Sequence, residues 1–292
     1  MVTEFPAALI MIREGLEASL IIAILFAYLR KIDRKDLYKY LWYGVGSSIS
    51  LSIIIGVAVY LLYGGLSDLQ GDLFEGIASL LAVCVLTYMI LWMTQNAKTL
   101  KKEIEGKIDS SIDTGQVRAI AFIAFITVFR EGIETVLFLN VLFIQDLSGT
   151  LIGVILGLII VLFASFLLHR KSVTLPLKDF FKYTSIILII FAAGLAGYGT
   201  HELIEAAEET EYELDGDISG WLFSKPYNLN PDDKSHPLHE KGAIGSIAKG
   251  LVGYDGDPEW LRIIVYLSYW IVIIAYLKKV DQLPFSKINN SK

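Results

Sequence analysis

The sequence predicts an all-α, polytopic membrane protein. Of its 292 residues, 54% are hydrophobic, and several apolar runs are long enough to cross a bilayer as helices. The alternation of apolar and polar residues that marks membrane β-barrel strands is absent. These observations favour a helical bundle in the membrane over a soluble domain.

Seven apolar segments have about the length that the hydrocarbon core of a bilayer requires of a helix. They are residues 5–29, 41–63, 73–93, 119–144, 150–168, 180–200 and 260–277. No basic stretch precedes the first segment, so we interpret it as a mature span rather than a cleavable signal peptide. We therefore predict seven transmembrane helices in a single domain, residues 1–292.

The first and fourth segments each contain a short charged motif. The motifs are Arg13-Glu14-Gly15-Leu16-Glu17 and Arg130-Glu131-Gly132-Ile133-Glu134, 117 residues apart. Positions three and four apart share a helix face, so the two glutamates of each motif point the same way and the arginine can reach the second one. Six charges at the bilayer centre would cost about 15–21 kcal/mol, at about 2.5–3.5 kcal/mol each. They must therefore face inward and be paired, protonated, hydrated or bound to metal.

The second and fifth segments carry small residues that allow close helix packing. These are Gly44, Gly46, Ser47 and Ser48 in the second segment, and Gly153 and Gly157 in the fifth. The third segment opens with Glu75, which is either a metal ligand at the outer end or a carboxylate favoured by the helix dipole.

Lysine and arginine residues predict the orientation of the chain, because they concentrate on the cytoplasmic side. They follow the first, third, fifth and seventh segments: Arg30, Lys31, Arg34, Lys35 and Lys39; Lys98, Lys101, Lys102, Lys107 and Arg118; Arg170, Lys171, Lys178 and Lys182; Lys278, Lys279, Lys287 and Lys292. The N-terminus and residues 64–72 and 145–149 contain none. We expect a plasma (inner) membrane protein with its N-terminus outside and its C-terminus in the cytoplasm.

The long connection 201–259 then lies outside, with 14 Asp and Glu against four Lys. Its first part, 201–209, continues the sixth helix, and the later prolines and glycines suggest irregular structure with short helices. His201, Glu202 and Glu205 are candidate metal ligands, although a solvated helix end is the simpler alternative. His236 and His239, beside Asp232 and Asp233, are more simply ordinary loop residues. The whole connection is either a solvated acidic loop or a vestibule that attracts metal ions.

The two motifs also suggest an internal repeat. Each motif helix is the first of three, and the predicted topology runs the two helices in opposite directions. Residues 5–93 and 119–200 therefore read as inverted repeats, with 260–277 as an added helix, and such repeats are a transporter architecture.

Two explanations compete for the motif charges. Arginine–glutamate clamps could lock the two motif helices together, but four glutamates and two arginines leave two negative charges unpaired. A multivalent cation would neutralise them, and carboxylate oxygens favour hard cations. No histidine or cysteine lies near either motif, which disfavours a zinc-type site. We favour a metal pathway through Glu14, Glu17, Glu131 and Glu134, tuned by Arg13 and Arg130.

The doubled motif on seven spans resembles the oxidase-dependent ferric iron permeases, which include the fungal high-affinity iron permease and the bacterial Efe-type permease. Some members of that family are assigned to lead uptake. The resemblance covers 5–205 and the seventh segment, and within it Glu75 and the stretch 87–93 also resemble that family. It implies passage of Fe³⁺ through the four motif glutamates, with a separate extracytoplasmic oxidase or iron-delivery partner.

Other functions remain open at this point. The chain could carry another cation such as Pb²⁺ or Mn²⁺, or be proton-coupled. A membrane enzyme with a carboxylate di-metal site is disfavoured because the spans lack a Glu-x-x-His pattern. A metal sensor is a further alternative. The one cysteine, Cys84, cannot form an internal disulfide, and without a Walker A motif we do not expect direct ATP hydrolysis. The doubled motif in oppositely oriented helices favours transport over sensing, so we expect a transporter rather than an enzyme. We expect neither an organic cofactor nor a nucleic-acid partner.

Overall fold

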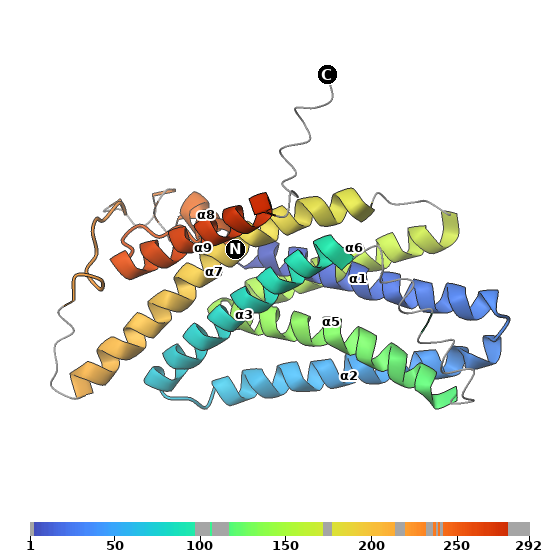
Figure 1. Ribbon diagram of the computed structural model, residues 1–292. Coiled ribbons are helices and arrows are strands. Elements are labelled where there is room, and N and C mark those ends of the chain that lie inside the picture. Colours follow the sequence, from blue (N-terminus) through green and yellow to red (C-terminus); the bar gives the residue numbers. More distant parts are fainter. Residues whose placement is uncertain are drawn as a thin grey trace, which may run out of the picture. The chain divides into compact units, whose positions relative to one another are not determined.

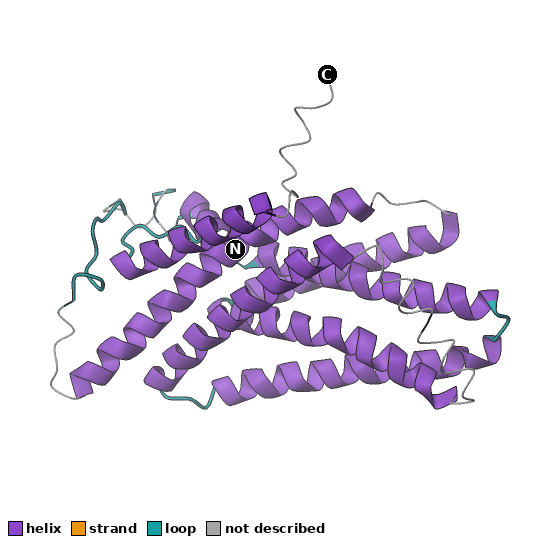
Figure 2. Ribbon diagram, viewed as in Figure 1, coloured by secondary structure: helices purple, strands orange, loops and turns teal. Residues whose placement is uncertain are grey.

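The computed structural model describes residues 3–96, 106, 117–171, 177–213, 220–231, 236, 237, 239 and 242–279. Within these ranges all regular structure is helical and no strand occurs, which confirms the predicted all-α class (Figure 2). The helices are α1 (Glu4–Lys31), η1 (Lys35–Leu37), α2 (Tyr38–Tyr63), α3 (Asp68–Asn96), α5 (Val117–Gln145), α6 (Leu147–Lys171), α7 (Leu177–Glu213), α8 (Ala243–Val252) and α9 (Trp260–Lys279) (Figure 1).

Every predicted segment coincides with one of these helices, but the helices extend further than the apolar runs. The largest extension is in α7, which continues past residue 200 to Glu213, as the sequence of 201–209 predicts. The predicted short helix in the long connection is α8. Eight residues named above lie outside the described residues: Lys98, Lys101, Lys102, Lys107, Asp232, Asp233, Lys287 and Lys292.

Among the described residues, five helices are long and apolar enough to cross a membrane: α2, α3, α6, α7 and α9. The chain is therefore a multi-pass membrane protein. Helices α1 and α5 are similarly long, at 28 and 29 residues, but each contains the three charges of a motif. The count of seven spans and the orientation of the termini stay predictions.

The helices form two compact units. The motif unit contains α1, η1, α2, the end of α3 from Tyr88, α5 and α6. The C-terminal unit contains the start of α3 up to Thr87, together with α7, α8 and α9.

In the motif unit, α1 packs against α6 through glycines. A Cβ atom at Gly157 would lie 2.8 Å from the backbone oxygen of Ala8, and one at Gly15 would lie 2.8 Å from Val161 Cγ2. Any side chain at these positions would push the helices apart. The hydroxyl groups of Ser165 and Ser19 join the same two helices at 3.0 Å.

Helix α5 packs against α2 in the same manner. A Cβ atom at Gly44 would meet the side chain of Ala124 at 2.9 Å, and Gly132 faces Ser52. Each motif helix thus lies closely against one glycine-bearing partner helix. Helices α1 and α5 also contact each other, which brings the two motifs together.

An apolar cluster closes one end of the motif unit, where α1, α2 and α5 meet. Its buried members are Ile21, Leu25, Tyr28, Leu29, Leu37, Leu41, Val45, Ile120, Ala124 and Val128. In a bilayer such side chains gain little from the hydrophobic effect, because lipid is as apolar as they are, so they hold the helices together mainly by van der Waals packing.

In the C-terminal unit, α7 packs against α8 and α9. The chain leaves α8 through Gly253, whose φ of 71° is left-handed, and a Cβ atom at Gly194 would lie 2.8 Å from its nitrogen. The segment 220–231 is held beside the start of α9, because Leu229 N donates to Gly256 O at 2.7 Å.

Candidate metal centre

The first motif lies in the middle of α1, and its three charged side chains are buried. Arg13 is 1% exposed, Glu14 2% and Glu17 6%. Arg13 Nη1 donates to Glu14 Oε1 at 3.1 Å, and its Nη2 lies 3.4 Å from Glu17 Oε1. The (i, i+4) ion pair predicted from the sequence is therefore present.

The second motif lies in the middle of α5 and is less enclosed. Glu131 is 6% exposed, whereas the side chains of Arg130 and Glu134 are 40% and 12% exposed. Arg130 Nε donates to Glu134 Oε1 at 3.0 Å, which is again the pair expected from helical spacing.

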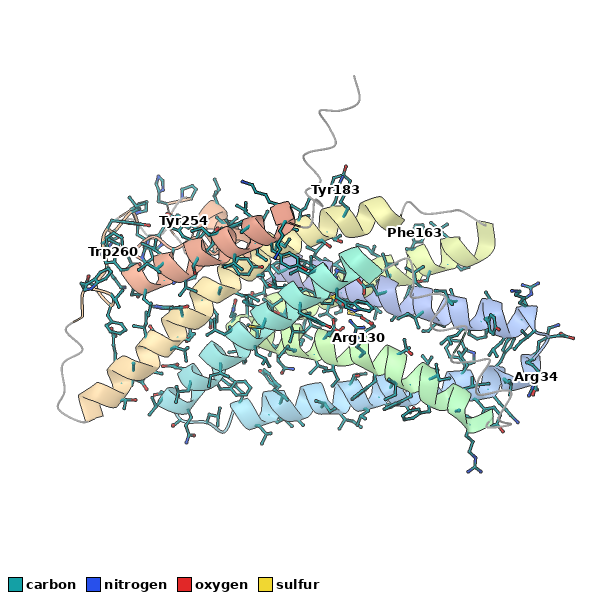
Figure 3. The ribbon with its side chains drawn as sticks, in the orientation of Figure 1. Arg34, Arg130, Phe163, Tyr183, Tyr254 and Trp260 are labelled. Atoms are coloured by element: carbon teal, nitrogen blue, oxygen red, sulfur yellow. The ribbon has the colours of Figure 1, made fainter. Side chains whose placement is uncertain are left out.

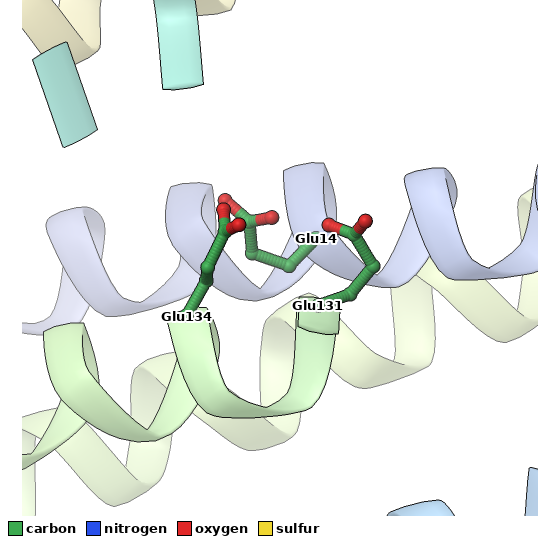
Figure 4. A group of neighbouring side chains, drawn as sticks. All are labelled: Glu14, Glu131 and Glu134. Carbon is green, nitrogen blue, oxygen red and sulfur yellow. The ribbon is translucent and has the colours of Figure 1, made fainter. Parts of the chain in front are cut away.

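Three motif carboxylates converge on one point between α1 and α5. One oxygen each from Glu14, Glu131 and Glu134 lies within 4.8 Å of the others (Figure 4). The two motifs, 117 residues apart in the chain, thus form one cluster. Glu17 adjoins it through its ion pair with Arg13.

The charges of this cluster do not balance, and several of its oxygens lack a hydrogen bond. Four glutamates face two arginines. Glu14 Oε2, Glu17 Oε1, Glu131 Oε2 and Glu134 Oε2 are buried without a hydrogen bond. An unsatisfied buried carboxylate oxygen is costly. A cation or protons could satisfy these oxygens, whereas a closed ion-pair clamp would leave them without a hydrogen bond.

Two residues from α3 contact the arginines of this site. The sequence predicts Trp92 only as an aromatic anchor at the membrane interface, and it does not single out Met89. Arg13 Nη2 donates to Met89 Sδ, and the guanidinium carbon of Arg130 lies 4.6 Å from the centre of the Trp92 ring. Their shared signal in the sequence was the stretch 87–93, which resembles the ferric iron permeases, but that resemblance assigned neither residue a contact with a motif arginine.

A family model described as the iron permease FTR1 family matches residues 4–279. The chain belongs to the iron permease FTR1 family. A ferrous iron permease EfeU from Yersinia pseudotuberculosis is 35% identical over 274 residues, covering 93% of this chain and 91% of that protein. The EfeU of an Escherichia coli strain is 31% identical over 278 residues, covering 94% and 95%.

An uncharacterized protein from Archaeoglobus fulgidus is 41% identical over 270 residues, covering 92% of this chain and 93% of its own. No solved structure matches the chain. Membership of the FTR1 family confirms the predicted resemblance. The family is one of iron permeases, which transport iron across a membrane.

This FTR1-family chain has a second acidic cluster in its C-terminal unit. Carboxylate oxygens of Asp72, Glu202 and Glu205 lie within 4.8 Å of one another. Glu202 is 8% exposed and the side chain of Glu205 is 50% exposed. Asp72 was missed in the sequence, although it lies one helical turn before Glu75 on α3.

The structure gives other partners to Glu75 and His201. Tyr198 donates a hydrogen bond to Glu75. His201 Nδ1 lies 3.1 Å from Glu259 Oε1, and its Nε2 lies 3.4 Å from Glu205 Oε1. Burial, the largest single effect, raises the pKa of Glu259, but its hydrogen bond with His201, a backbone hydrogen bond and the nearby charges of His201 and Arg262 together outweigh burial and lower that pKa. His201 therefore links α7 to the residue before α9.

The remaining candidate ligands, His236 and His239, lie in a turn. His239 N donates to His236 O at 2.9 Å, and His239 is 7% exposed. Neither belongs to a carboxylate cluster within the described ranges.

Proposed function

We propose that this chain carries ferric iron across the membrane through the carboxylates of Glu14, Glu17, Glu131 and Glu134. The observation that supports this proposal is the convergence of Glu14, Glu131 and Glu134 within 4.8 Å, with buried oxygens that have no hydrogen-bond partner. A cation in transit would satisfy those oxygens and would offset the net charge of −2 that remains after the arginines are counted.

Oxygen donors favour the hard ion Fe³⁺, and a trivalent cation compensates more charge than a divalent one. Ferric passage requires that iron be oxidised outside the cell. The single cysteine of the chain, Cys84, cannot form a copper-type thiolate cluster, so we assign oxidation or delivery to a separate extracytoplasmic partner.

Passage of Fe²⁺ is the second candidate, and the curated relatives favour it because they are named ferrous iron permeases. Carboxylates also bind Fe²⁺, Mn²⁺ and Pb²⁺, so the donor atoms alone do not separate these ions. A carboxylate di-metal enzyme is disfavoured because no histidine accompanies the motif glutamates.

The proposal includes an outer collecting site on the extracytoplasmic side. Asp72, Glu202 and Glu205 would attract cations there, because clustered negative charge raises the local concentration of counter-ions. His201 and Glu75 would support this cluster through their contacts with Glu205 and Tyr198.

We further propose seven spans, with the N-terminus outside and the C-terminus in the cytoplasm, arranged as inverted repeats. The glycine contacts of α1 with α6 and of α5 with α2 support the repeat, because they match position by position. Counterparts on the motif helices are separated by 117 residues, and counterparts on the partner helices by 109. Gly153 contacts Glu4 and Ala7, and its counterpart Gly44 contacts Ala121 and Ala124. Val161 contacts Gly15, and its counterpart Ser52 contacts Gly132. Ser165 contacts Ser19, and its counterpart Gly56 contacts Val136.

Uptake of radiolabelled iron tests the proposed pathway. Cells expressing the wild type, Glu14→Gln or Glu131→Gln would be supplied with Fe²⁺ and Fe³⁺ separately, and the amount of each protein in the membrane would be measured. We expect both variants to insert normally and to lose at least tenfold in uptake, because an amide keeps the size of the side chain but removes its charge. Glu208→Gln, at an exposed position of α7, is the matched control.

The outcomes separate the alternatives. Normal uptake by both motif variants would rule out the carboxylate pathway. Carboxylate-dependent uptake of Fe²⁺ in the absence of any oxidant would favour Fe²⁺ as the transported ion, and no oxidase would then be needed. Uptake of Mn²⁺ or Pb²⁺ in preference to both iron ions would change the substrate but not the pathway.

A further inference from the structure

One face of α3 contacts the arginines of both motifs. Met89 and Trp92 are three residues apart, which places them on the same side of the helix. Met89 contacts Arg13 of the first motif and Trp92 contacts Arg130 of the second. All four residues belong to the motif unit.

Met89 takes a hydrogen bond that a carboxylate would otherwise receive. Arg13 Nη2 donates to Met89 Sδ, a weak acceptor. The same nitrogen lies 3.4 Å from Glu17 Oε1, which has an ion pair but no hydrogen bond. Met89 is 1% exposed, so its sulfur is held there by packing.

Trp92 has a similar effect on Arg130. The guanidinium lies over the indole at 4.6 Å from the ring centre, within the range of a cation–π interaction. Only Nε of Arg130 bonds Glu134, at 3.0 Å, although arginine commonly binds a carboxylate through two parallel hydrogen bonds. Glu134 Oε2 is left without a partner.

We infer that Met89 and Trp92 are positioning residues that hold the two motif arginines away from full pairing with the glutamates, and so keep carboxylate oxygens available to iron. Without them each arginine would close onto its own carboxylates and compete with the cation. This inference rests on the proposed function, since it assigns these contacts a role in iron affinity.

Kinetics of iron uptake test it, with the full chain in cells and radiolabelled iron as the probe. Trp92→Leu removes the aromatic face, Trp92→Phe keeps one, and Met89→Leu replaces sulfur with carbon at similar volume. Tyr88→Leu is the matched control, because Tyr88 is the neighbouring residue on α3 and is 65% exposed.

We expect Trp92→Leu and Met89→Leu to raise the KM for iron by about three- to tenfold, the range that one cation–π contact or hydrogen bond represents. The maximum rate per inserted protein should stay within about twofold, because the carboxylates are intact. Trp92→Phe should restore most of the affinity, and Tyr88→Leu should match the wild type.

Three results would overturn the inference. The first is a wild-type KM in both Trp92→Leu and Met89→Leu. The second is an equal rise in Tyr88→Leu, which would indicate a general effect on α3. The third is a loss confined to the maximum rate. A wild-type protein that takes up no iron would overturn the proposed function itself, and this inference with it.

Discussion

The same motif occupies different surroundings in its two copies, and the difference lies in single side chains. Arg13 is 1% exposed and its neighbours are two glutamates and a thioether, whereas the side chain of Arg130 is 40% exposed and lies over an indole. Breaking a buried ion pair leaves an uncompensated charge and costs about 3–5 kcal/mol, far more than at an exposed position. We therefore expect substitution of Arg13 to destabilise the protein more than substitution of Arg130.

Asp146 shows how one side chain outside the spans fixes a helix. It precedes α6, and its Oδ1 accepts hydrogen bonds from Gly149 N at 2.9 Å and Ser148 Oγ at 3.1 Å, which is an N-cap. We expect Asp146→Ala to lower the stability of the protein by about 1 kcal/mol, and Asp146→Asn to lower it less. Thermal unfolding in detergent at pH 7 measures both changes.

The pH dependence of this cap has a definite sign. The hydrogen bond from Gly149 N lowers the pKa of Asp146 below its usual value of 3.8. Its stabilisation is therefore fully present above pH 3.8 and is lost as pH falls through the lowered pKa. The difference between wild type and Asp146→Asn should shrink below about pH 4. A difference that stays constant into acid would show that the carboxylate charge has no part in the cap.

At the scale of elements, glycines decide which helices pair. The motif helices α1 and α5 pack closely on α6 and α2 because glycines remove the side chains that would separate them. Two of these glycines, Gly15 and Gly132, stand at the centre of the motifs. The motif therefore combines charges on one face with a packing glycine on another.

Substituting glycines distinguishes packing from helix propensity. Gly157→Ala would place a Cβ atom 2.8 Å from the backbone oxygen of Ala8, which cannot move without shifting α1, so we expect a loss of about 1–3 kcal/mol. At Gly46 nothing lies within 4 Å of the added atom, and Gly46→Ala should be neutral or stabilise α2 by up to about 1 kcal/mol. Thermal unfolding of the two variants side by side checks this, and equal losses would contradict the packing argument.

The sequence predicted the helices well because apolar runs report directly on burial in lipid. It was less accurate at their ends, as in α3, which begins at Asp68 rather than at residue 73, because polar residues such as Asp68 can begin a helix without an apolar signal. Helical spacing also predicted the ion pairs within each motif. It could not predict Met89, Trp92 or Asp72 as neighbours of these sites, because such contacts depend on how α3 packs against other helices.

At the scale of the whole molecule, the membrane topology depends on whether the motif helices α1 and α5 cross the bilayer. If only the five most apolar helices span, Ser67 before α3 and Ser148 at the start of α6 lie on opposite sides. If α1 and α5 also span, both serines lie on the same side. Basic residues favour the second arrangement, because both connections lack lysine and arginine.

Labelling of single cysteines tests this topology. In a Cys84→Ser background, we expect Ser67→Cys and Ser148→Cys to react with a membrane-impermeant maleimide in intact cells, because both positions are exposed and predicted to be outside. Lys35→Cys, exposed in the basic connection after α1, should react only after permeabilisation. Reaction at position 67 but not at 148 in intact cells would exclude α5 as a span. It would also remove the inverted repeat, because two repeats of opposite orientation require both motif helices to cross the bilayer.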